Sequence, residues 1–234
     1  MTKTLCFIPA RGGSKRIPRK NLLPLGGKPL LAYSIEVATR ADLFEDVVVS
    51  SDDKEILDLA DSLGVIADPR PERLSGDAIR FVEVIEEYLL RPEMKKTYTN
   101  IACMLPTCPF RTVDDIRASY RIFLEQAGDV FLIAVKEYDF PPQLALNLAE
   151  DGITLSMREP DTYGHTTRSQ SLSKAYHPNG AIYLATVEGF LREQTFFADP
   201  MIGYVIPPSR SFDIDYPHQF WIAECMMKEL EKDQ

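Results

Sequence analysis

"TLCFIPARGGSKRIPRKN", residues 4–21, joins a short apolar run to a loop that carries five cations between Arg11 and Lys20. The apolar run predicts a short buried strand over Thr4–Ile8. The pair Gly12–Gly13 that follows allows the backbone to approach a ligand closely and to turn its N–H groups toward an anion. We therefore expect an anion-binding loop directly after a strand of the core.

The uneven distribution of charge supports the same expectation. Residues 1–35 contain seven of the 26 Lys and Arg residues and none of the 35 acidic residues, although the formal net charge of the chain is −9. A general nucleic-acid binder needs a broad basic face, which such an acidic chain does not offer. The pattern indicates a small anionic partner and argues against nucleic acid as a partner.

Strand and helix signals alternate from this loop to residue 136. Short apolar or β-branched runs predict further strands at residues 47–49, 65–66, 101–105 and 130–135. Capping residues and helical spacing predict helices that start at Pro29, at Asp52 or Asp53, at Arg80 and at Thr112, with ends at Gly64, Leu90 and Gly128. This alternation predicts an α/β fold, with a mostly parallel sheet and helices on both faces. Ligands of such sheets bind beyond the carboxyl ends of the strands, where the basic loop is expected.

The alternation ends after Lys136, and residues 137–175 are rich in turns and short polar runs. This segment is too long for a simple loop, so we expect a small inserted β-rich subdomain there. Residues 1–136 and 176–234 would form the main domain. Within its second part, strands are expected at residues 181–185 and 203–206, and helices at residues 187–194 and 216–230.

Cysteine usage and hydropathy point to the cytoplasm. The cysteines show no CxxC spacing, and three of the four lie in or beside apolar runs, which favours reduced core thiols. The apolar stretch at residues 5–10 is too short for a signal peptide, and no run approaches the ~18 apolar residues of a membrane span. We expect a cytoplasmic protein without a membrane partner.

The basic loop combines several kinds of anion donor. Formal charge comes from Arg11, Lys15, Arg16, Arg19 and Lys20, and neutral donors come from Ser14 and Asn21. A triphosphate needs this mixture of backbone amides and cations. The loop matches neither GxxxxGK[ST] nor the dinucleotide pattern GxGxxG. A solvated basic turn is the plain alternative.

A second element, Asp213-Ile-Asp215, suggests a metal site. If the backbone is extended there, both carboxylates face the same side, and Ile214 points toward the core. Magnesium prefers one or two carboxylates together with phosphate oxygens. On its own the pair is weak evidence, because a solvated turn or a helix cap explains most such motifs. Together with a phosphate-binding loop it predicts a Mg²⁺ site.

These elements resemble the motifs of the CMP-sialic acid synthetases, also called acylneuraminate or nonulosonic acid cytidylyltransferases. The residues that carry the resemblance are "IPARGGSKRIPRKN", "GKPLLAYSIEVA", "VVVSSDD", "LPTCPFRT", "RSQSL", "NGAIY", "TFF" and "SFDID", in the order of the family. The resemblance implies a Rossmann-like nucleotidyltransferase fold and magnesium dependence. It also implies a homodimer in which the inserted subdomain reaches the neighbouring subunit's site.

The resemblance also implies roles for individual residues. The nucleotide would be held by Arg11, Gly12, Gly13, Ser14, Lys20, Asn21 and Arg70, and the metal by Asp213 and Asp215. The sugar acid would be bound by Gln143, Arg168, Asn179, Tyr183, Phe196 and Phe197. The residues expected to act in catalysis are Arg11, Lys20 and Asp213. For Phe196 and Phe197, a place at the edge of the core is an equal alternative.

The implied reaction is attack by the anomeric hydroxyl of a nine-carbon 2-keto sugar acid on the α-phosphorus of CTP, which releases pyrophosphate. Leu105 stands where the family usually has Gln, and Gln143 stands where it often has Lys. N-acetylneuraminate is the first expectation for the acid, with legionaminic and pseudaminic acids as alternatives. A nucleotide sensor without catalysis is a further alternative, disfavoured by the retained carboxylate pair.

Overall fold

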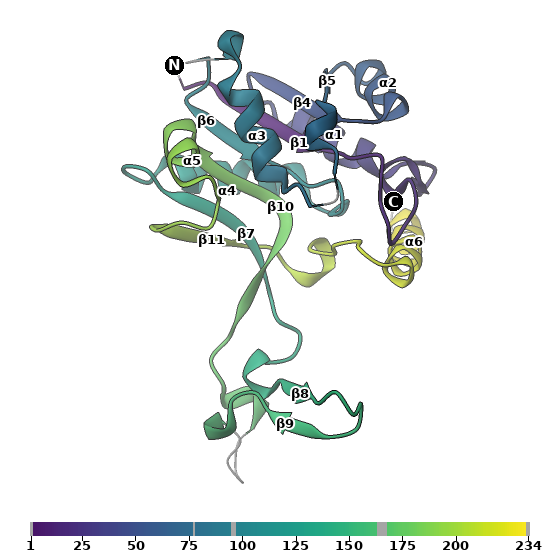
Figure 1. Cartoon of the computed structure of the whole chain (residues 1–234), viewed down its shortest axis with the longest axis vertical. Helices are drawn as coiled ribbons and strands as arrows, with labels where there is room; N and C mark the ends of the chain where they lie inside the picture. Colours follow the sequence, from purple (N-terminus) through teal and green to yellow (C-terminus); the bar gives the residue numbers. More distant parts are fainter. Residues whose placement is uncertain (1, 77, 95–96, 163–167, 233–234) are drawn as a thin grey trace.

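The computed structural model describes residues 2–76, 78–94, 97–162 and 168–232. These residues form a seven-stranded sheet in the order β11-β7-β10-β6-β1-β4-β5 (Figure 1). Its strands are β1 Thr4–Pro9, β4 Asp46–Ser51, β5 Ile66–Pro69, β6 Asn100–Cys103, β7 Phe131–Glu137, β10 Tyr176–Thr186 and β11 Met201–Val205. Only β10 runs antiparallel to its neighbours within this sheet. The predicted mostly parallel sheet is confirmed.

Helices cover both faces of the sheet, as predicted. One face packs against α1 Leu30–Ala41, α2 Lys54–Ser62 and α4 Val113–Leu124, and the other against α3 Phe81–Leu90 and α5 Val187–Glu193. Along β1, Cys6 and Ile8 enter the first core, while Leu5 and Phe7 enter the second. Because successive strand residues face opposite sides, a strand covered on both faces is apolar throughout.

Several element boundaries differ from the sequence expectation for local reasons. Pro29 is not the first helical residue: it has an extended backbone in strand β3 Lys28–Pro29, which pairs with β2 Pro24–Leu25, and α1 starts at Leu30. The helix expected to reach Gly128 ends at Leu124, and Gly128 adopts a positive φ of 82° in the following turn. Asp53 is the residue that caps α2, since its side chain accepts a hydrogen bond from the Glu55 amide.

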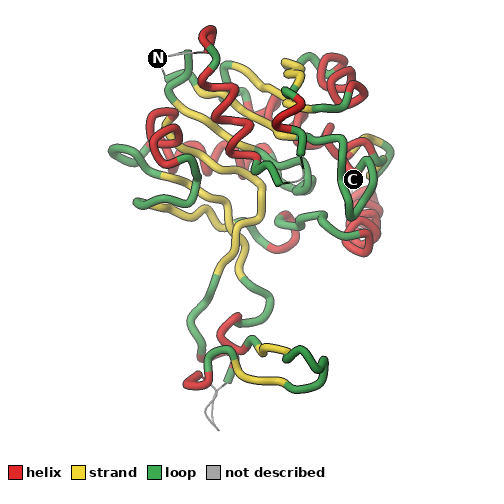
Figure 2. The backbone as a smooth tube through the Cα atoms, in the orientation of Figure 1, coloured by secondary structure: helices red, strands yellow, loops and turns green. Residues whose placement is uncertain are grey.

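Beyond the sheet, residues 138–162 and 168–175 form a separate extension that β7 and β10 connect to the main body (Figures 1 and 2). It contains the hairpin of β8 Leu146–Leu148 and β9 Leu155–Met157 and short 3₁₀ helices such as η4 Pro142–Leu144. All residues of both hairpin strands are exposed. No residue in the described part of the extension is buried, so that part has no core of its own.

The last helix, α6 Pro217–Lys232, lies beside the β2–β3 hairpin, and the segment that precedes it packs into a small third core with Ile17, Leu25 and Ile214. Cys6, Cys103 and Cys108 are buried thiols, whereas Cys225 on α6 is exposed. Among the described helices, none is both long and apolar enough to cross a membrane.

Asp115 joins α4 to the segment before α6, and its removal should destabilise the fold. The buried carboxylate accepts hydrogen bonds from Thr112 at the helix cap and from Arg210, whose Nε and Nη2 lie 3.0 and 2.8 Å away. Burial alone would raise the pKa of Asp115, but the hydrogen bonds of Arg210 and Thr112 outweigh it and lower that pKa. We expect Asp115→Asn to lower the free energy of unfolding by about 1–3 kcal/mol at neutral pH.

The lowered pKa fixes the pH dependence of this effect. The carboxylate stabilises the folded state above its ordinary pKa, and this contribution is lost as the pH falls through the lowered value. Urea unfolding of the wild type and Asp115→Asn should therefore converge in acid. Asp114→Asn, an exposed neighbour in the same helical turn, is the matched control. An equal difference at neutral and acid pH would contradict the assignment.

Candidate active site

The candidate site lies at the carboxyl-terminal ends of the parallel strands. The basic loop follows β1, Asp52 and Asp53 follow β4, and the loop of residues 104–112 follows β6. Because these strands are parallel, the three segments emerge side by side. This places polar side chains from distant parts of the chain at one location.

Carboxylates after β4 fix the basic loop. The Gly12 amide donates to Asp52 Oδ1 over 2.8 Å, and Asn21 Nδ2 donates to the Arg11 carbonyl over 2.9 Å. A Cβ at Gly12 would lie 2.6 Å from the Cβ of Asp53, so a side chain has no room there. Gly13 faces open space. The loop is held rigidly and leaves a free backbone surface at Gly13.

The structure brings the basic loop to the Asp-Ile-Asp segment, although about 195 residues separate them in sequence. Lys20 Nζ donates to the Ile214 carbonyl over 2.7 Å and lies 3.0 Å from Asp215 Oδ1. Arg16 lies 3.3 Å from Asp215 Oδ2, and its guanidinium stacks over the Tyr216 ring. Loop cations and the carboxylate pair therefore share one location, as two elements acting on one polyphosphate require.

Asp213 has features expected of a metal ligand. Ile214 is buried, as predicted, and its amide donates to the Thr107 carbonyl over 2.9 Å, which fixes the segment. Burial raises the pKa of Asp213 more than the Thr107 hydrogen bond and the nearby Lys20 charge lower it. Its buried Oδ1 has no hydrogen-bond partner in the described part of the chain. A buried, unpaired carboxylate oxygen beside a second carboxylate suits a hard cation.

The donor set also limits which cation fits. No group of three or more His, Cys, Asp or Glu side chains that could hold a metal occurs among the described residues. A cation at Asp213 and Asp215 would therefore take its other ligands from water and phosphate. Mg²⁺ binds in this way, through one or two carboxylates and substrate phosphates.

A cavity of about 440 Å³ adjoins the basic loop. Arg11, Arg70 and Arg80 line it, together with apolar side chains that include Phe81, Leu105 and Phe197. Burial lowers the pKa of Arg70, whose Nη2 donates to the Ser50 carbonyl and whose buried Nε has no partner among the described residues. The cavity thus combines a cationic part with an apolar part.

Two of the residues assigned to the sugar acid lie in the core instead. Phe196 has no exposed surface, and it packs against Phe81 and Tyr183 with ring centroids 6.3 and 5.5 Å away. Tyr183 is itself buried. The alternative of a core position is therefore correct for Phe196, while its neighbour Phe197 is half exposed and lines the cavity. Adjacent side chains on this segment point to opposite sides.

Both polar atoms of the Asn179 side chain form hydrogen bonds within the protein. It is buried, its Oδ1 accepts from the Ala181 amide over 3.0 Å, and its Nδ2 donates to Ser211 Oγ over 2.6 Å. Direct binding of a sugar by Asn179 is therefore not supported. Its contacts instead connect β10 to the segment that carries the two aspartates.

Gln143 and Arg168 do not join the site of their own chain. Both lie in the extension, which projects away from the basic loop (Figure 1). Gln143 Nε2 donates to the Ser173 carbonyl over 3.1 Å, and Arg168 is exposed. A role for these two residues therefore requires another subunit.

Sequence reasoning missed Arg80, Asp52 and Arg111. The sequence pattern indicates only a helix start at Arg80 and only a possible helix cap at Asp52. Arg111 closes the motif "LPTCPFRT", and an arginine within such an apolar stretch was the available signal.

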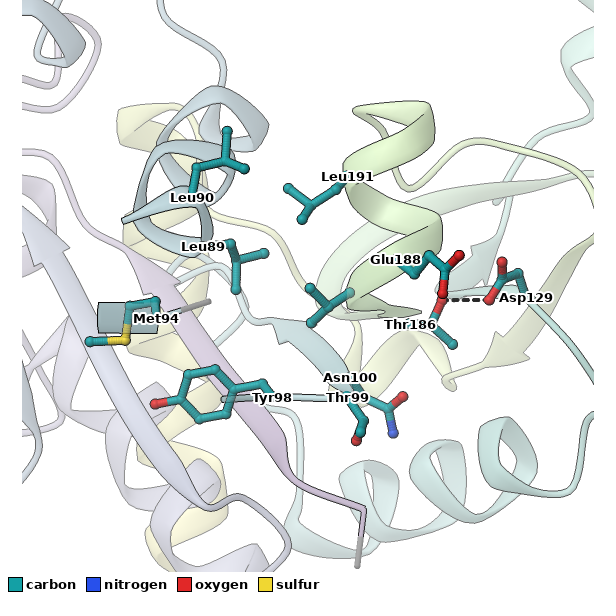
Figure 3. Close-up of a pocket in the computed structure, with 11 residues that line it drawn as sticks. Leu89, Leu90, Met94, Tyr98, Thr99, Asn100, Asp129, Thr186, Glu188 and Leu191 are labelled. Carbon is teal, nitrogen blue, oxygen red and sulfur yellow. Dashed lines mark hydrogen bonds between the residues drawn. The ribbon is translucent and has the colours of Figure 1, made fainter. Parts of the chain in front are cut away.

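A larger cavity, of about 710 Å³, lies at the opposite end of the strands. Figure 3 shows Leu89 and Leu90 facing Leu191 across it, with Tyr98 and Asn100 near its floor. This cavity lies where β6 begins and β10 ends. It is therefore remote from the basic loop, which follows the other end of the parallel strands. Size alone does not identify the functional site.

Comparison with known proteins agrees with the fold and with the sequence motifs. A family model described as "Cytidylyltransferase" matches residues 5–206. A pseudaminic acid cytidylyltransferase of Campylobacter jejuni serotype O:2 is 36% identical over 228 residues, which cover 97% of both chains. An N-acylneuraminate cytidylyltransferase of Escherichia coli O18:K1:H7 is 34% identical over 233 residues, covering all of this chain and 54% of that protein.

A solved structure of a CMP:2-keto-3-deoxy-manno-octonic acid synthetase complexed with CTP has the same fold. Its TM-score is 0.72 at 16% identity, and the match covers 98% of this chain and 100% of the other. The motifs, the sheet and the relatives agree: this α/β nucleotidyltransferase belongs to the cytidylyltransferase family.

Proposed function

We propose that this chain transfers the cytidylyl group of CTP to a nonulosonic acid, and that pseudaminic acid is the preferred acceptor. The observation that carries the proposal is the contact of Lys20 with Asp215, because it puts the cationic loop and the carboxylate pair within reach of one polyphosphate. The relative at 36% identity acts on pseudaminic acid by name and matches along nearly its whole length. Pseudaminic acid therefore replaces N-acetylneuraminate as the leading candidate.

The apolar part of the cavity argues against N-acetylneuraminate as the acid. Phe81, Leu105 and Phe197 offer no hydrogen bonds from their side chains to a hydroxyl-rich tail. Pseudaminic acid carries a methyl group and acyl groups, which such a surface accommodates, whereas burying unpaired hydroxyls against it would cost free energy. Leu105, at the position where Gln is expected, contributes to this wall.

In the proposed reaction, the anomeric hydroxyl oxygen bonds to the α-phosphorus of CTP. The bond from that phosphorus to the bridging oxygen of the β-phosphate breaks, pyrophosphate leaves, and the hydroxyl proton is released. Mg²⁺ held by Asp213 and Asp215 would neutralise phosphate charge when bound. Arg11, Lys20 and the amide of Gly13 would hold the polyphosphate, so that positioning and charge stabilisation supply most of the rate.

Nucleotide binding would exchange ion-pair partners within the site. In the ligand-free chain, Asp215 pairs with Lys20 and Arg16. In the proposed complex, these cations would contact phosphate oxygens, and the carboxylate would contact the metal. Each of these side chains would then have an oppositely charged partner in both states, which lets the segment keep one conformation.

We further propose that a second copy of the chain covers the extension. A two-stranded hairpin is marginal in water without packing. Here the hairpin and its surroundings expose large apolar side chains, with Phe140 and Leu148 each 62% exposed and Ile153 84% exposed. In such a dimer, Gln143 and Arg168 would reach the partner's site, as the family resemblance implies.

Leu148→Asp should separate the proposed dimer, since it places a charge in the buried interface. We expect the dimer dissociation constant to rise about 30-fold or more, as for loss of an interface hot spot. Light scattering after size exclusion measures the mass across a dilution series. Leu124→Asp, on an exposed apolar residue outside the extension, is the matched control. A wild-type monomer, or a Leu148→Asp dimer of unchanged affinity, would overturn the assembly.

Pyrophosphate release from CTP and Mg²⁺ with a panel of nonulosonic acids tests the function. We expect the highest kcat/KM with pseudaminic acid and lower values with legionaminic acid and N-acetylneuraminate. Preference for N-acetylneuraminate would overturn the choice of acid but not the reaction. Release with none of the acids, combined with CTP binding, would instead support a nucleotide sensor.

A further inference from the structure

Arg111 is a buried cation that the proposed mechanism does not use. It lies just before α4, is 2% exposed, and forms no ion pair with any residue in the described ranges. Burial lowers the pKa of Arg111. A buried guanidinium that forms no direct ion pair costs free energy, so its hydrogen bonds must contribute something that an apolar side chain would not.

The Arg111 guanidinium joins three segments. Nη1 donates to the carbonyls of Gly180 and Ala181 in β10, and Nη2 donates to the Leu105 carbonyl and to Ser34 Oγ in α1. The fixed planar fork of arginine suits this set of acceptors, which a lysine ammonium cannot reproduce. One side chain therefore fixes the position of the loop after β6 relative to β10.

These hydrogen bonds of Arg111, which we call the Arg111 clamp, fix the position of Leu105, whose side chain lines the 440 Å³ cavity. The Leu105 amide donates to the Gly180 carbonyl over 3.0 Å, so that carbonyl accepts from both Leu105 and Arg111. Gly180 has a φ of +73°, and a Cβ there would lie 3.0 Å from Leu105 Cδ1. The register of β10 against β7 shifts at this place. Leu105 is thus packed tightly against an irregular strand, and Arg111 donates hydrogen bonds to the buried carbonyls of Gly180 and Ala181.

The nucleotide loop is anchored differently. Its conformation depends on the contacts of Gly12 with Asp52 and of Asn21 with the Arg11 carbonyl. Within the described ranges, the Arg111 side chain donates instead to Gly180, Ala181, Leu105 and Ser34. Displacing the Leu105 wall should therefore disturb the sugar-acid side of the cavity and leave CTP binding intact.

We propose that Arg111 is a positioning residue that places the Leu105 wall against the sugar acid without touching the substrate itself. The proposal rests on the proposed function, since it assigns the apolar part of the cavity to the acid. Small displacements of such a wall reduce the rate because the reacting groups lose their alignment.

Arg111→Lys tests the proposal. We expect kcat/KM for the preferred acid, at saturating CTP, to fall about 10- to 100-fold, while the dissociation constant of Mg·CTP from calorimetry changes less than about threefold. A general loss of folded protein would lower the active fraction equally for both ligands. The thermal midpoint, measured in parallel, reports the folded fraction at the assay temperature.

Arg117→Lys is the matched control. Arg117 also binds backbone carbonyls, those of Ala41 and Arg40, each over 3.1 Å, but it lies away from the cavity. We expect kcat/KM for the acid and the dissociation constant of Mg·CTP to stay within about twofold of the wild type. Should Arg111→Lys fail to fold, Ser34→Ala removes one hydrogen-bond acceptor of the Arg111 guanidinium. This variant should also lower kcat/KM for the acid without changing the dissociation constant of Mg·CTP, but by a smaller factor.

The outcomes separate this proposal from the proposed function. A wild-type enzyme that turns over none of the acids overturns both. An active wild type whose Arg111→Lys or Ser34→Ala variant loses CTP affinity and acid kcat/KM in parallel, or keeps both, overturns only the role of Arg111. A selective fall in kcat/KM for the acid supports it.

Discussion

Asp213→Asn is expected to lower turnover by about 10³-fold or more, because it removes the carboxylate charge that would bind the metal. The substitution is nearly isosteric, so the cavity and the backbone contact between Ile214 and Thr107 should persist. An amide oxygen binds Mg²⁺ more weakly than a carboxylate and does not neutralise it. The loss should therefore appear in kcat and in the Mg²⁺ concentration needed for half-maximal rate.

The stability of this variant follows from the raised pKa of Asp213. A carboxyl group whose pKa is raised on folding stabilises the folded state below its ordinary pKa, and this contribution is lost as the pH rises through the folded value. At neutral pH the ionised side chain therefore weakens the fold, and the neutral Asn avoids that penalty. We expect a thermal midpoint at or above that of the metal-free wild type.

Three measurements test the Asp213→Asn variant. Pyrophosphate release reports turnover, electron paramagnetic resonance of Mn²⁺ reports metal binding, and thermal unfolding reports stability. Asp58→Asn, on the surface of α2 and paired with Lys54, is the control for loss of one carboxylate. Normal turnover in Asp213→Asn would remove the metal assignment. Lost activity together with unfolding would remove the claim that the charge acts on the reaction.

Local pattern was sufficient to predict the central strands. In β1 both cores are supplied by consecutive residues, so "LCFI" is apolar throughout and its identification depends on no distant contact. In β10 the first residues, Tyr176 and His177, are not buried, and only residues 181–185 have the apolar pattern. The strand was predicted too short because its outer part pairs with β7 on the way to the extension.

The candidate site could be predicted only in part, since many roles depend on tertiary contacts. The basic loop and the carboxylate pair each carry a local chemical signature, and their meeting follows from the fold. Phe196 and Phe197 are identical neighbours, so no local property distinguishes the buried one from the exposed one. The contact of Asp52 with Gly12 spans 40 residues and has no sequence signature.

Lys20→Met is expected to lower kcat/KM for CTP about 10²–10³-fold, on the scale of a lost oxyanion donor. Lys20 is only 12% exposed along its side chain, and its ammonium contacts Asp215 and the Ile214 carbonyl. Methionine retains most of the apolar stem, so packing near the loop should change little. The loss would come from the missing positive charge at the polyphosphate.

Steady-state kinetics and calorimetry with Mg·CTP distinguish where this charge acts. If Lys20 binds the ground-state polyphosphate, the dissociation constant of CTP rises with KM; if it acts on the transition state, kcat falls at constant affinity. Lys54→Met, on a side chain 85% exposed and paired with Asp58, is the control. Turnover and affinity in Lys20→Met within about threefold of the wild type would mean that the loop does not hold the nucleotide, because an ammonium at a triphosphate contributes far more than that.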